Sequence, residues 1–263
     1  MSRVFAISNQ KGGVGKTTTA INLAASLAAS EFKVLVIDSD PQGNATSGLG
    51  IQKNSNRPSL YHVLLEGVDP KEALVPTELE GLSLIPADKN LVGANLELVE
   101  IPNREFRLRE SIQQIRNDFR FILIDCPPAL DLLTLNALVA ADSVLVPIQC
   151  EFFALEGISE LMDTIERVRQ SFQHPLQVEG ILLTMFDDRT NLTRQVAADL
   201  KEFFGDEVFQ TVIPRSVRLA EAPSFGKPIL SYDPRSKGAE SYIKLAKEIL
   251  DHEQNGKSAQ SAG

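Results

Sequence analysis

The sequence has little of what disulfide-bonded, metal-rich or membrane-spanning proteins contain. Its 263 residues include two cysteines, three histidines and no tryptophan. Cys126 and Cys150 cannot build a disulfide framework, and because each follows an apolar run we interpret them as small buried or loop residues. The scattered histidines do not complete a zinc site. No apolar stretch approaches the roughly 20 residues that span a bilayer.

A secretory signal and an excess of positive charge are missing as well. Residues 4–8 lead directly into a glycine-rich motif, so we expect a protein of the reducing cytosol with no membrane segment. Its 26 lysines and arginines face 35 aspartates and glutamates, which gives a net charge of −9. This balance argues against attraction of the whole molecule to phosphate polymers and leaves room only for a local basic face.

Aromatic residues make up only 6% of the chain, whereas hydrophobic residues make up 43%, which is typical of parallel α/β sheets with aliphatic cores. Short apolar runs, which we predict as strands, alternate with stretches of helical periodicity. Strands are expected at residues 4–8, 34–38, 82–86, 121–125, 143–147, 178–184 and 208–213, and helices at residues 17–29, 156–170, 193–204 and 239–250. The alternation predicts an α/β fold with a mainly parallel, twisted sheet flanked by helices on both faces.

No internal repeat or linker divides the sequence, so we predict a single domain over residues 1–253. The remaining tail, residues 254–263, is polar and rich in small residues, and we expect it to be disordered. Residues 48–80 are the least regular part, because Gly, Pro, Asn and Ser cluster at residues 50–59. We interpret them as an insertion over the sheet.

The most specific motif follows the first predicted strand. Residues 9–18 read NQKGGVGKTT and lead into a helix, which is the strand–loop–helix context of a P-loop. Its glycines let backbone N–H groups point inward at a polyphosphate, and the helix adds its positive dipole end. Lys16 is expected to bind the β- and γ-phosphates, and the Thr17 hydroxyl to ligate Mg²⁺. The motif predicts a P-loop ATPase that binds ATP through Gly12, Gly13, Val14, Gly15, Lys16, Thr17 and Thr18.

Two predicted strands end in acidic residues. The strand at 34–38 ends in Asp38 and is followed by Asp40, and the strand at 121–125 ends in Asp125. Carboxylates at the carboxyl ends of parallel strands lie where ligands bind in open α/β sheets. An apolar strand that ends in aspartate has the Walker B form, so Asp125 is expected to hold Mg²⁺ through water. A capped turn remains an alternative interpretation of the segment around Asp40.

Basic residues gather in a third segment, although the protein as a whole is acidic. Residues 212–238 contain five basic and two acidic residues, and Arg189 and Arg194 precede them. Binding of DNA without regard to sequence needs several Lys or Arg side chains on one face. An ordinary polar loop and a solvated surface also explain these residues.

One departure from the general P-loop pattern carries a family resemblance. Gln10 stands where a glycine is expected, and a second lysine, Lys11, follows it. The string KGGVGKTT resembles the deviant Walker A box of the ParA/MinD ATPases. The strings DPQGN, DCPP, RLAEAPSFGKPI and YDPRSKGAESY extend the resemblance over nearly the whole chain, and the last two look most like chromosomal ParA/Soj proteins.

The resemblance implies a shared ATP site. Lys11 would reach the nucleotide of a second subunit, so that ATP lies between the two chains of a homodimer. Asp40 would lie near the attacking water and the metal, with Asp38 in support. The catalytic residues would then be Lys11, Lys16 and Asp40, and the metal site would comprise Thr17, Asp40 and Asp125. Positive charge opposite the developing oxyanion suits phosphoryl transfer.

The resemblance also assigns the base and the DNA contacts. Pro214, Arg215 and Ser216 would pack on adenine, although many relatives have asparagine in place of Ser216. Arginines that match Arg189 and Arg218 would bind double-stranded DNA without sequence preference. Because no His or Glu general base is evident in the loops nearest the phosphate, we expect slow hydrolysis that a ParB-type centromere-binding partner stimulates.

We therefore predict a cytoplasmic, nucleoid-associated ATPase that segregates DNA with ATP and Mg²⁺. The alternative is a MinD-like or other positioning ATPase that does not bind DNA. A MinD-like protein would need a basic amphipathic helix near its C-terminus, which DHEQNGKSAQSAG does not provide. A nitrogenase-iron-protein-like reductase would need differently placed cysteines. A larger plasmid ParA would need an N-terminal helix-turn-helix domain, for which a P-loop beginning at residue 9 leaves no room.

Overall fold

A computed structural model describes residues 2–53 and 56–260, with the side chains described as far as residue 253. Over these residues the chain forms a sheet in the order β3-β4-β2-β5-β1-β6-β7. The strands are β1 (Arg3–Ile7), β2 (Val34–Asp38), β3 (Val75–Pro76), β4 (Leu82–Ile85), β5 (Phe121–Asp125), β6 (Ser143–Gln149) and β7 (Gln177–Thr184). All neighbouring strands are parallel except β3 and β4. The predicted α/β fold is confirmed.

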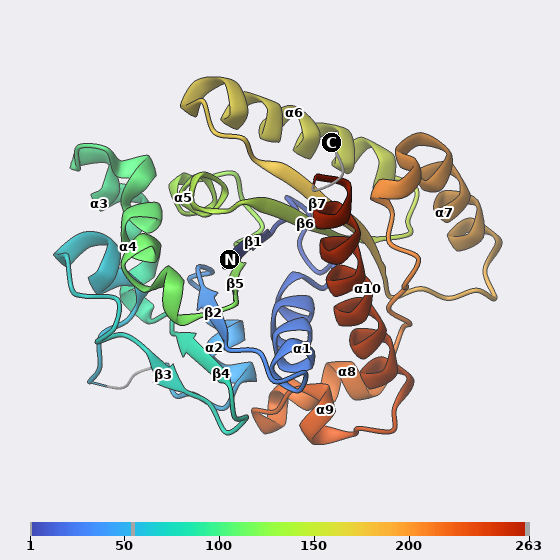
Figure 1. Ribbon diagram of the computed structural model, residues 1–263, viewed down its shortest axis with the longest axis horizontal. Coiled ribbons are helices and arrows are strands. Elements are labelled where there is room, and N and C mark those ends of the chain that lie inside the picture. The colour runs from blue at the N-terminus through green and yellow to red at the C-terminus, as the bar shows by residue number, and fades with distance from the viewer. Residues whose placement is uncertain (1, 54–55, 261–263) are drawn as a thin grey trace.

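Helices connect the strands and cover both faces of the sheet (Figure 1). They are α1 (Lys16–Ala28), α2 (Asn44–Gly48), α3 (Ala94–Glu97), α4 (Arg107–Ile115), α5 (Leu132–Ala140), α6 (Ala154–Phe172), α7 (Asn191–Phe204), α8 (Val217–Glu221), α9 (Ile229–Tyr232) and α10 (Lys237–Gln260). Shorter helical turns lie at His62–Glu66, Lys89–Val92, Leu98–Glu100, Arg104–Phe106, Arg116–Asp118, Gly205–Glu207 and Ala222–Phe225. The sequence prediction missed α4 and α5. None of the described helices is long and apolar enough to cross a membrane.

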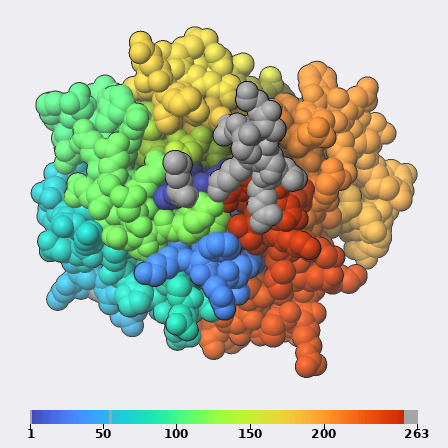
Figure 2. Space-filling model, viewed as in Figure 1, coloured from blue at the N-terminus to red at the C-terminus, as the bar shows by residue number. Residues whose placement is uncertain are grey.

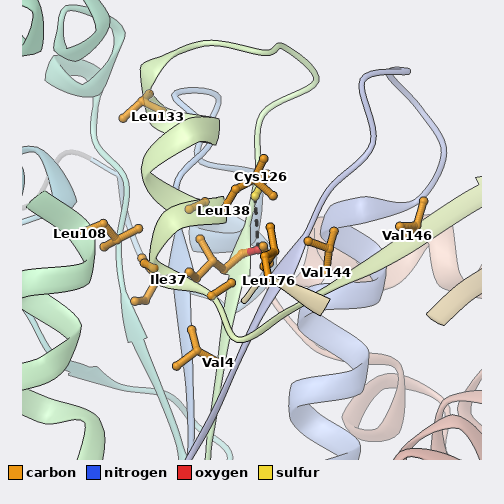
Figure 3. Packing of buried hydrophobic residues seen from close by; sticks show 14 of the residues in the cluster. Val4, Ile37, Leu108, Cys126, Leu133, Leu138, Val144, Val146 and Leu176 are labelled. Atoms are coloured by element: carbon orange, nitrogen blue, oxygen red, sulfur yellow. Dashed lines mark hydrogen bonds between the residues drawn. The ribbon is translucent and has the colours of Figure 1, made fainter. Parts of the chain in front are cut away.

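The strands are apolar on both faces because each face has its own layer of helices. On β1, Val4 and Ala6 contribute to the core cluster beneath α4, α5 and α6, whereas Phe5 and Ile7 contribute to the cluster beneath α1 and α10. Figure 3 shows part of the first cluster, which includes Leu133 and Leu138 of α5 and Val4 and Val144 of the strands. In the space-filling view of the same orientation as Figure 1, helices and loops conceal most of the sheet (Figure 2). The continuous apolar runs in the sequence follow from this two-sided burial.

The predicted strand at 208–213 is wrong. The segment runs beside β7, and the N–H groups of Phe209 and Ile213 donate to the carbonyls of Ile181 and Leu183 at 3.0 and 2.8 Å. However, its only ladder contact is an isolated bridge between Val208 and Ile181. The intervening N–H groups of residues 210 and 211 donate instead to the Glu248 carboxylate on α10, so a regular strand is not completed.

The described residues of the two segments predicted to be irregular contain some regular structure. Residues 48–80 place Leu60, Val63 and Leu64 in the core beside α4, and they also supply the edge strand β3. The helix α10 continues to Gln260, through most of the segment predicted to be a disordered tail. Residues 261–263 lie outside the described residues, and the division of the chain at residue 253 stays a prediction.

Candidate functional site

The predicted P-loop joins β1 to α1. Gly13 and Gly15 have φ angles of +76° and +89°, in the left-handed region where any other residue is strained. Gly15 is the residue before α1, so the chain turns sharply and the first N–H groups of the helix lie free for a ligand. These amides and the dipole of α1 make the loop an anion site, as the motif predicts.

Hydrogen bonds within the loop and to the neighbouring strands β6 and β7 fix its shape. Asn9 Nδ2 donates to the Pro147 carbonyl at 2.8 Å, and its Oδ1 accepts from the Lys11 N–H at 2.9 Å. The Thr184 hydroxyl, at the end of β7, donates to the Val14 carbonyl at 2.7 Å. The sequence prediction missed Thr184, because nothing in the sequence indicates that a residue 170 positions later contacts the loop.

The two lysines of the loop occupy different environments. Lys16 is 7% exposed, and its Nζ donates to the Lys11 carbonyl at 2.9 Å. Burial lowers the pKa of Lys16, whereas Asp125, Cys126 and Asp40 raise it. The Lys11 side chain is 47% exposed and forms an ion pair with Glu151, just beyond β6. The sequence prediction did not include Glu151.

The acidic strand ends lie next to the loop. In the strand register Asp125 on β5 is level with Asp38 on β2 on one side and with Ile7 on β1 on the other. Both carboxylates are completely buried. Asp38 accepts from the N–H and the hydroxyl of Thr46 at 2.7 and 2.6 Å. Burial raises the pKa of Asp38 to about 6, although the hydrogen bonds from Thr46 lower it.

Asp125 differs from Asp38 in lacking partners. Neither of its carboxylate oxygens has a hydrogen-bond partner among the described residues. Burial and the neighbouring Asp38 raise the pKa of Asp125 well above its usual range. The Thr17 hydroxyl lies close enough to lower this pKa, although not in hydrogen-bonding geometry. A buried carboxylate without a partner needs a cation, and an aspartate beside a threonine hydroxyl suits Mg²⁺.

No group of three His, Cys, Asp or Glu residues within the described part of the chain is arranged to hold a metal on its own. A magnesium ion here would therefore take most of its ligands from phosphate and water, as Mg²⁺ commonly does. Asp40 lies on the loop after β2, is 7% exposed, and its Oδ1 accepts from the Gln42 N–H at 2.9 Å. This turn holds Asp40 just beyond the carboxyl end of β2, at the same end of the sheet as Asp125.

A pocket of about 340 Å³ adjoins the phosphate loop. Pro214, Arg215 and Ser216, the residues expected at the base, line it together with Gly15 and Thr18 of the loop and helix. Its remaining lining residues are Thr184, Met185, Ile213, Val217, Leu219, Ala220 and Tyr242. A mostly apolar pocket beside a phosphate loop suits a flat purine base.

Arg189 lies on the loop between β7 and α7, and Arg218 lies on α8, which lines this pocket. A bridge between Phe186 and Pro214 ties the loop after β7, which carries Arg189, to the segment that leads into α8 and Arg218. Both side chains are exposed, by 84% and 58%, and both form ion pairs within the chain. The structure therefore presents both arginines to solvent at the end of the sheet where the phosphate loop lies.

The cysteines take no part in this site. Both are buried and free, and burial raises the pKa of Cys126 above its usual range and that of Cys150 to about 11. The Cys126 thiol lies near the Ile124 carbonyl at the end of β5 (Figure 3). Their interpretation as buried residues is confirmed.

Comparison with known proteins identifies the family to which this chain belongs. Residues 2–178 match a family model described as an AAA domain. The chain is 54% identical to the chromosome partitioning protein ParA of Myxococcus xanthus, over 95% of this chain and 88% of that protein. It is 52% identical to the sporulation initiation inhibitor protein Soj of Bacillus subtilis, over 95% of this chain and 98% of that protein.

A solved structure, cobyrinic acid a,c-diamide synthase of Mycobacterium smegmatis with bound ADP and magnesium, superposes with a TM-score of 0.85. It is 37% identical in sequence, and the match covers 97% of both chains. In both comparisons the sequence identity exceeds one half over 95% of this chain. The chain belongs to the ParA/Soj family of chromosome-partitioning P-loop ATPases.

Proposed function

We propose that the protein moves DNA by cycling between a monomer and an ATP-bound sandwich dimer. The contrast between the two lysines of the phosphate loop carries the proposal. Lys16 is buried and oriented toward its own loop, where it serves the nucleotide of its own subunit. Lys11 lies exposed at the rim, where its ammonium can reach a nucleotide held by a second copy.

Hydrolysis in this site depends mainly on positioning and charge. Lys16 and, across the dimer, Lys11 place positive charge on the phosphate oxygens where negative charge develops. Asp40 orients the attacking water, and Thr17 and Asp125 hold Mg²⁺, which neutralises the phosphates when bound. Asp40 in a turn is a weak base, so basal hydrolysis is slow and a ParB-type partner accelerates it.

The base pocket and the arginines connect nucleotide state to DNA. Pro214, Arg215 and Ser216 pack on adenine, and Arg189 and Arg218 contact backbone phosphates of double-stranded DNA of any sequence. Each dimer doubles these arginines, and counterion release makes affinity rise steeply with the number of phosphate contacts. The ATP-bound dimer then associates with the nucleoid in the cytoplasm, and hydrolysis releases it.

Light scattering after size exclusion tests the dimer. With a non-hydrolysable ATP analogue the protein is expected to double in mass, and with ADP it is expected to stay monomeric. Lys11→Ala should keep nucleotide binding by the single chain and lose the dimer. Lys71→Ala is the matched control, because Lys71 is also an exposed lysine that pairs with a carboxylate, that of Asp118. A Lys11→Ala protein that still dimerises would contradict the shared site.

Fluorescence anisotropy with a labelled duplex tests the DNA contacts. The ATP-analogue form is expected to bind at low salt, and Arg189→Ala with Arg218→Ala should abolish that binding without changing the dimer. Arg109→Ala on α4, which covers the other face of the sheet from α1, serves as a control. If the dimer ignores duplex DNA at low salt, DNA segregation is excluded.

A positioning ATPase that sorts a protein cargo is the second candidate. Two observations favour it: the net charge of −9, and the ion pairs that already occupy Arg189 and Arg218. In that case the nucleotide-dependent dimer would form as described, and the anisotropy of the duplex would not change.

A further inference from the structure

Arg189 and Arg218, the arginines that we propose to contact DNA, already form ion pairs with carboxylates of this chain. Arg189 donates from Nε to one oxygen of Asp187 at 2.8 Å and from Nη2 to the other at 2.7 Å. The pair is bidentate, which is the strongest geometry for an arginine and a carboxylate. Asp187 is 21% exposed, whereas Arg189 is 84% exposed, so the carboxylate lies beneath the guanidinium.

Arg218 has a similar arrangement on a different element. Its Nη1 donates to Glu221 one helical turn later at 3.1 Å, and its Nε lies 3.6 Å from Asp233. The same Glu221 oxygen also accepts from the Tyr232 hydroxyl at 3.2 Å, which holds the carboxylate in place. Arg218 thus faces two negative charges, and neither arginine is a free cation.

The two segments that carry these ion pairs are hydrogen-bonded to each other. The Phe186 N–H donates to the Ile213 carbonyl at 2.9 Å, and the Arg215 N–H donates to the Phe186 carbonyl at 3.1 Å. The pairs therefore lie on two segments that are hydrogen-bonded to each other beside the base pocket. Each arginine lies on the same short segment as the carboxylate that pairs with it, Arg189 with Asp187 on the loop after β7 and Arg218 with Glu221 on α8.

We propose that Asp187 and Glu221 weaken the binding of duplex DNA by competing with its phosphates for Arg189 and Arg218. A phosphate must either displace the carboxylate or accept the remaining N–H groups while the carboxylate stays near and repels it. The inference rests on the proposed DNA binding and adds to it two residues that set its strength. Weak contacts of this kind let the protein leave the DNA readily after hydrolysis.

At neutral pH the Asp187 carboxylate is charged and can compete with DNA phosphates for Arg189. The hydrogen bonds from Arg189 hold the pKa of Asp187 at about 2, so the carboxylate is ionised wherever the protein is folded and active. An exposed ion pair is a weak interaction in water, so a phosphate polymer can compete for the arginine. The carboxylates therefore reduce DNA affinity without abolishing it.

Asp187→Asn and Glu221→Gln test the inference, because each removes a negative charge and keeps the shape of the side chain. Binding to a labelled duplex of arbitrary sequence is measured by anisotropy with the non-hydrolysable ATP analogue, from about 50 to 200 mM salt. Each variant is expected to bind roughly 3- to 5-fold more tightly at low salt, and the double variant by about the product. The advantage should shrink as salt increases.

Glu80→Gln is the matched control. Glu80 is exposed before β4, at the opposite edge of the sheet, and it makes no ion pair or hydrogen bond with the described residues. The control removes the same charge, so an equal gain in DNA affinity would mean that only net charge matters and would overturn the inference. Binding of a fluorescent ATP analogue and the mass of the dimer confirm that each variant is folded and loaded.

The remaining outcomes separate the inference from the proposed function. If the wild-type dimer binds DNA and both variants bind it equally or more weakly, the carboxylates orient the arginines, and only the inference is overturned. If the wild-type dimer does not bind DNA, the proposed function is overturned and the inference with it. Tighter binding by Glu221→Gln supports the inference even if Asp187→Asn does not fold.

Discussion

The phosphate edge (Lys16 and Asp125) and the arginine face (Arg189 and Arg218) lie at the same end of the sheet. They differ in burial and in how their charges are compensated. At the phosphate edge Asp125 is completely buried with no hydrogen-bond partner among the described residues, and Lys16 is nearly buried beside it. On the arginine face Arg189 and Arg218 are exposed, and carboxylates compensate their charge. Buried charge without compensation is costly unless a ligand arrives, whereas an exposed ion pair contributes little either way. For the proposed function this difference means that the first region would bind its ligand tightly, whereas the second would bind DNA and release it.

Lys16→Ala should produce the largest effect, because it removes the buried cation of the first region. In the proposed mechanism its ammonium contacts the phosphates whose charge grows during transfer, and loss of one such group typically lowers a rate by about 100- to 1,000-fold. Hydrolysis should fall below detection, and affinity for ATP should fall as well. A phosphate-release assay and a fluorescent nucleotide titration measure both. The control is Lys71→Ala, and a Lys16→Ala enzyme of near-normal rate would mean that the region is not the active site.

Asp125→Asn should have opposite effects on stability and on function. The neutral amide avoids a buried charge, so the variant without nucleotide and metal is expected to melt several °C higher than the wild type, at roughly 2–4 °C per kcal/mol. The variant should gain no further stability from Mg²⁺ with ATP, whereas the wild type should. Differential scanning fluorimetry, with a chelator or with Mg²⁺ and ATP, measures these shifts.

The pH dependence of this difference has a definite sign. Because the pKa of Asp125 is raised above its ordinary value near 3.8, the unfolded chain releases the proton before the folded protein does. The wild type should therefore lose stability relative to Asp125→Asn as the pH rises above about 4. Asp118→Asn, at an exposed aspartate, is the control and should show no such trend. Equal melting temperatures of the wild type and Asp125→Asn at neutral pH would show that the carboxylate is not destabilising.

The same contrast explains how much the sequence could predict. The glycines at 13 and 15 and the aspartates that end β2 and β5 were predictable, because loop geometry and strand ends leave local patterns in the sequence. Thr184 and Glu151 were not, because they reach the loop from β7 and β6 through tertiary contacts. The strand predicted at 208–213 failed for the same reason, since Glu248 on α10 takes its N–H groups.

The helices missed between β4 and β6 show a related limit. The helix α5 is apolar almost all round, because it is buried against the sheet and its neighbours, and it therefore lacks the one-sided stripe that indicates a surface helix. The ion pairs on the arginine face could not be predicted either, because the sequence shows the charges but not which of them pair. Asp187 and Arg189 are two residues apart, a spacing that carries no structural meaning until the loop is formed.

Thr184→Val should have an intermediate effect on ATP affinity, because Thr184 contacts the phosphate loop and also lines the adjoining pocket. The substitution keeps the shape of the side chain and leaves the Val14 carbonyl unpaired in a buried position. Such a loss costs about 1–3 kcal/mol, so ATP affinity should fall by up to roughly 5- to 160-fold while the fold persists. Isothermal titration with the ATP analogue measures it. Thr211→Val, at a half-buried threonine next to the same β7, should change affinity little, and an equal loss would show a general effect of valine.

Arg189→Ala and Arg218→Ala should have the smallest effect on the folded protein. Even with two hydrogen bonds to Asp187, an arginine that is 84% exposed gains little, because water and salt screen its charge. Melting temperatures without DNA should stay within about 2 °C of the wild type. A fall of more than about 5 °C for either variant would show that its ion pair is part of the framework of the fold, because exposed pairs do not contribute that much. The arginine face would then be built like the phosphate edge, and the difference between tight binding and release would have to come from the dimer.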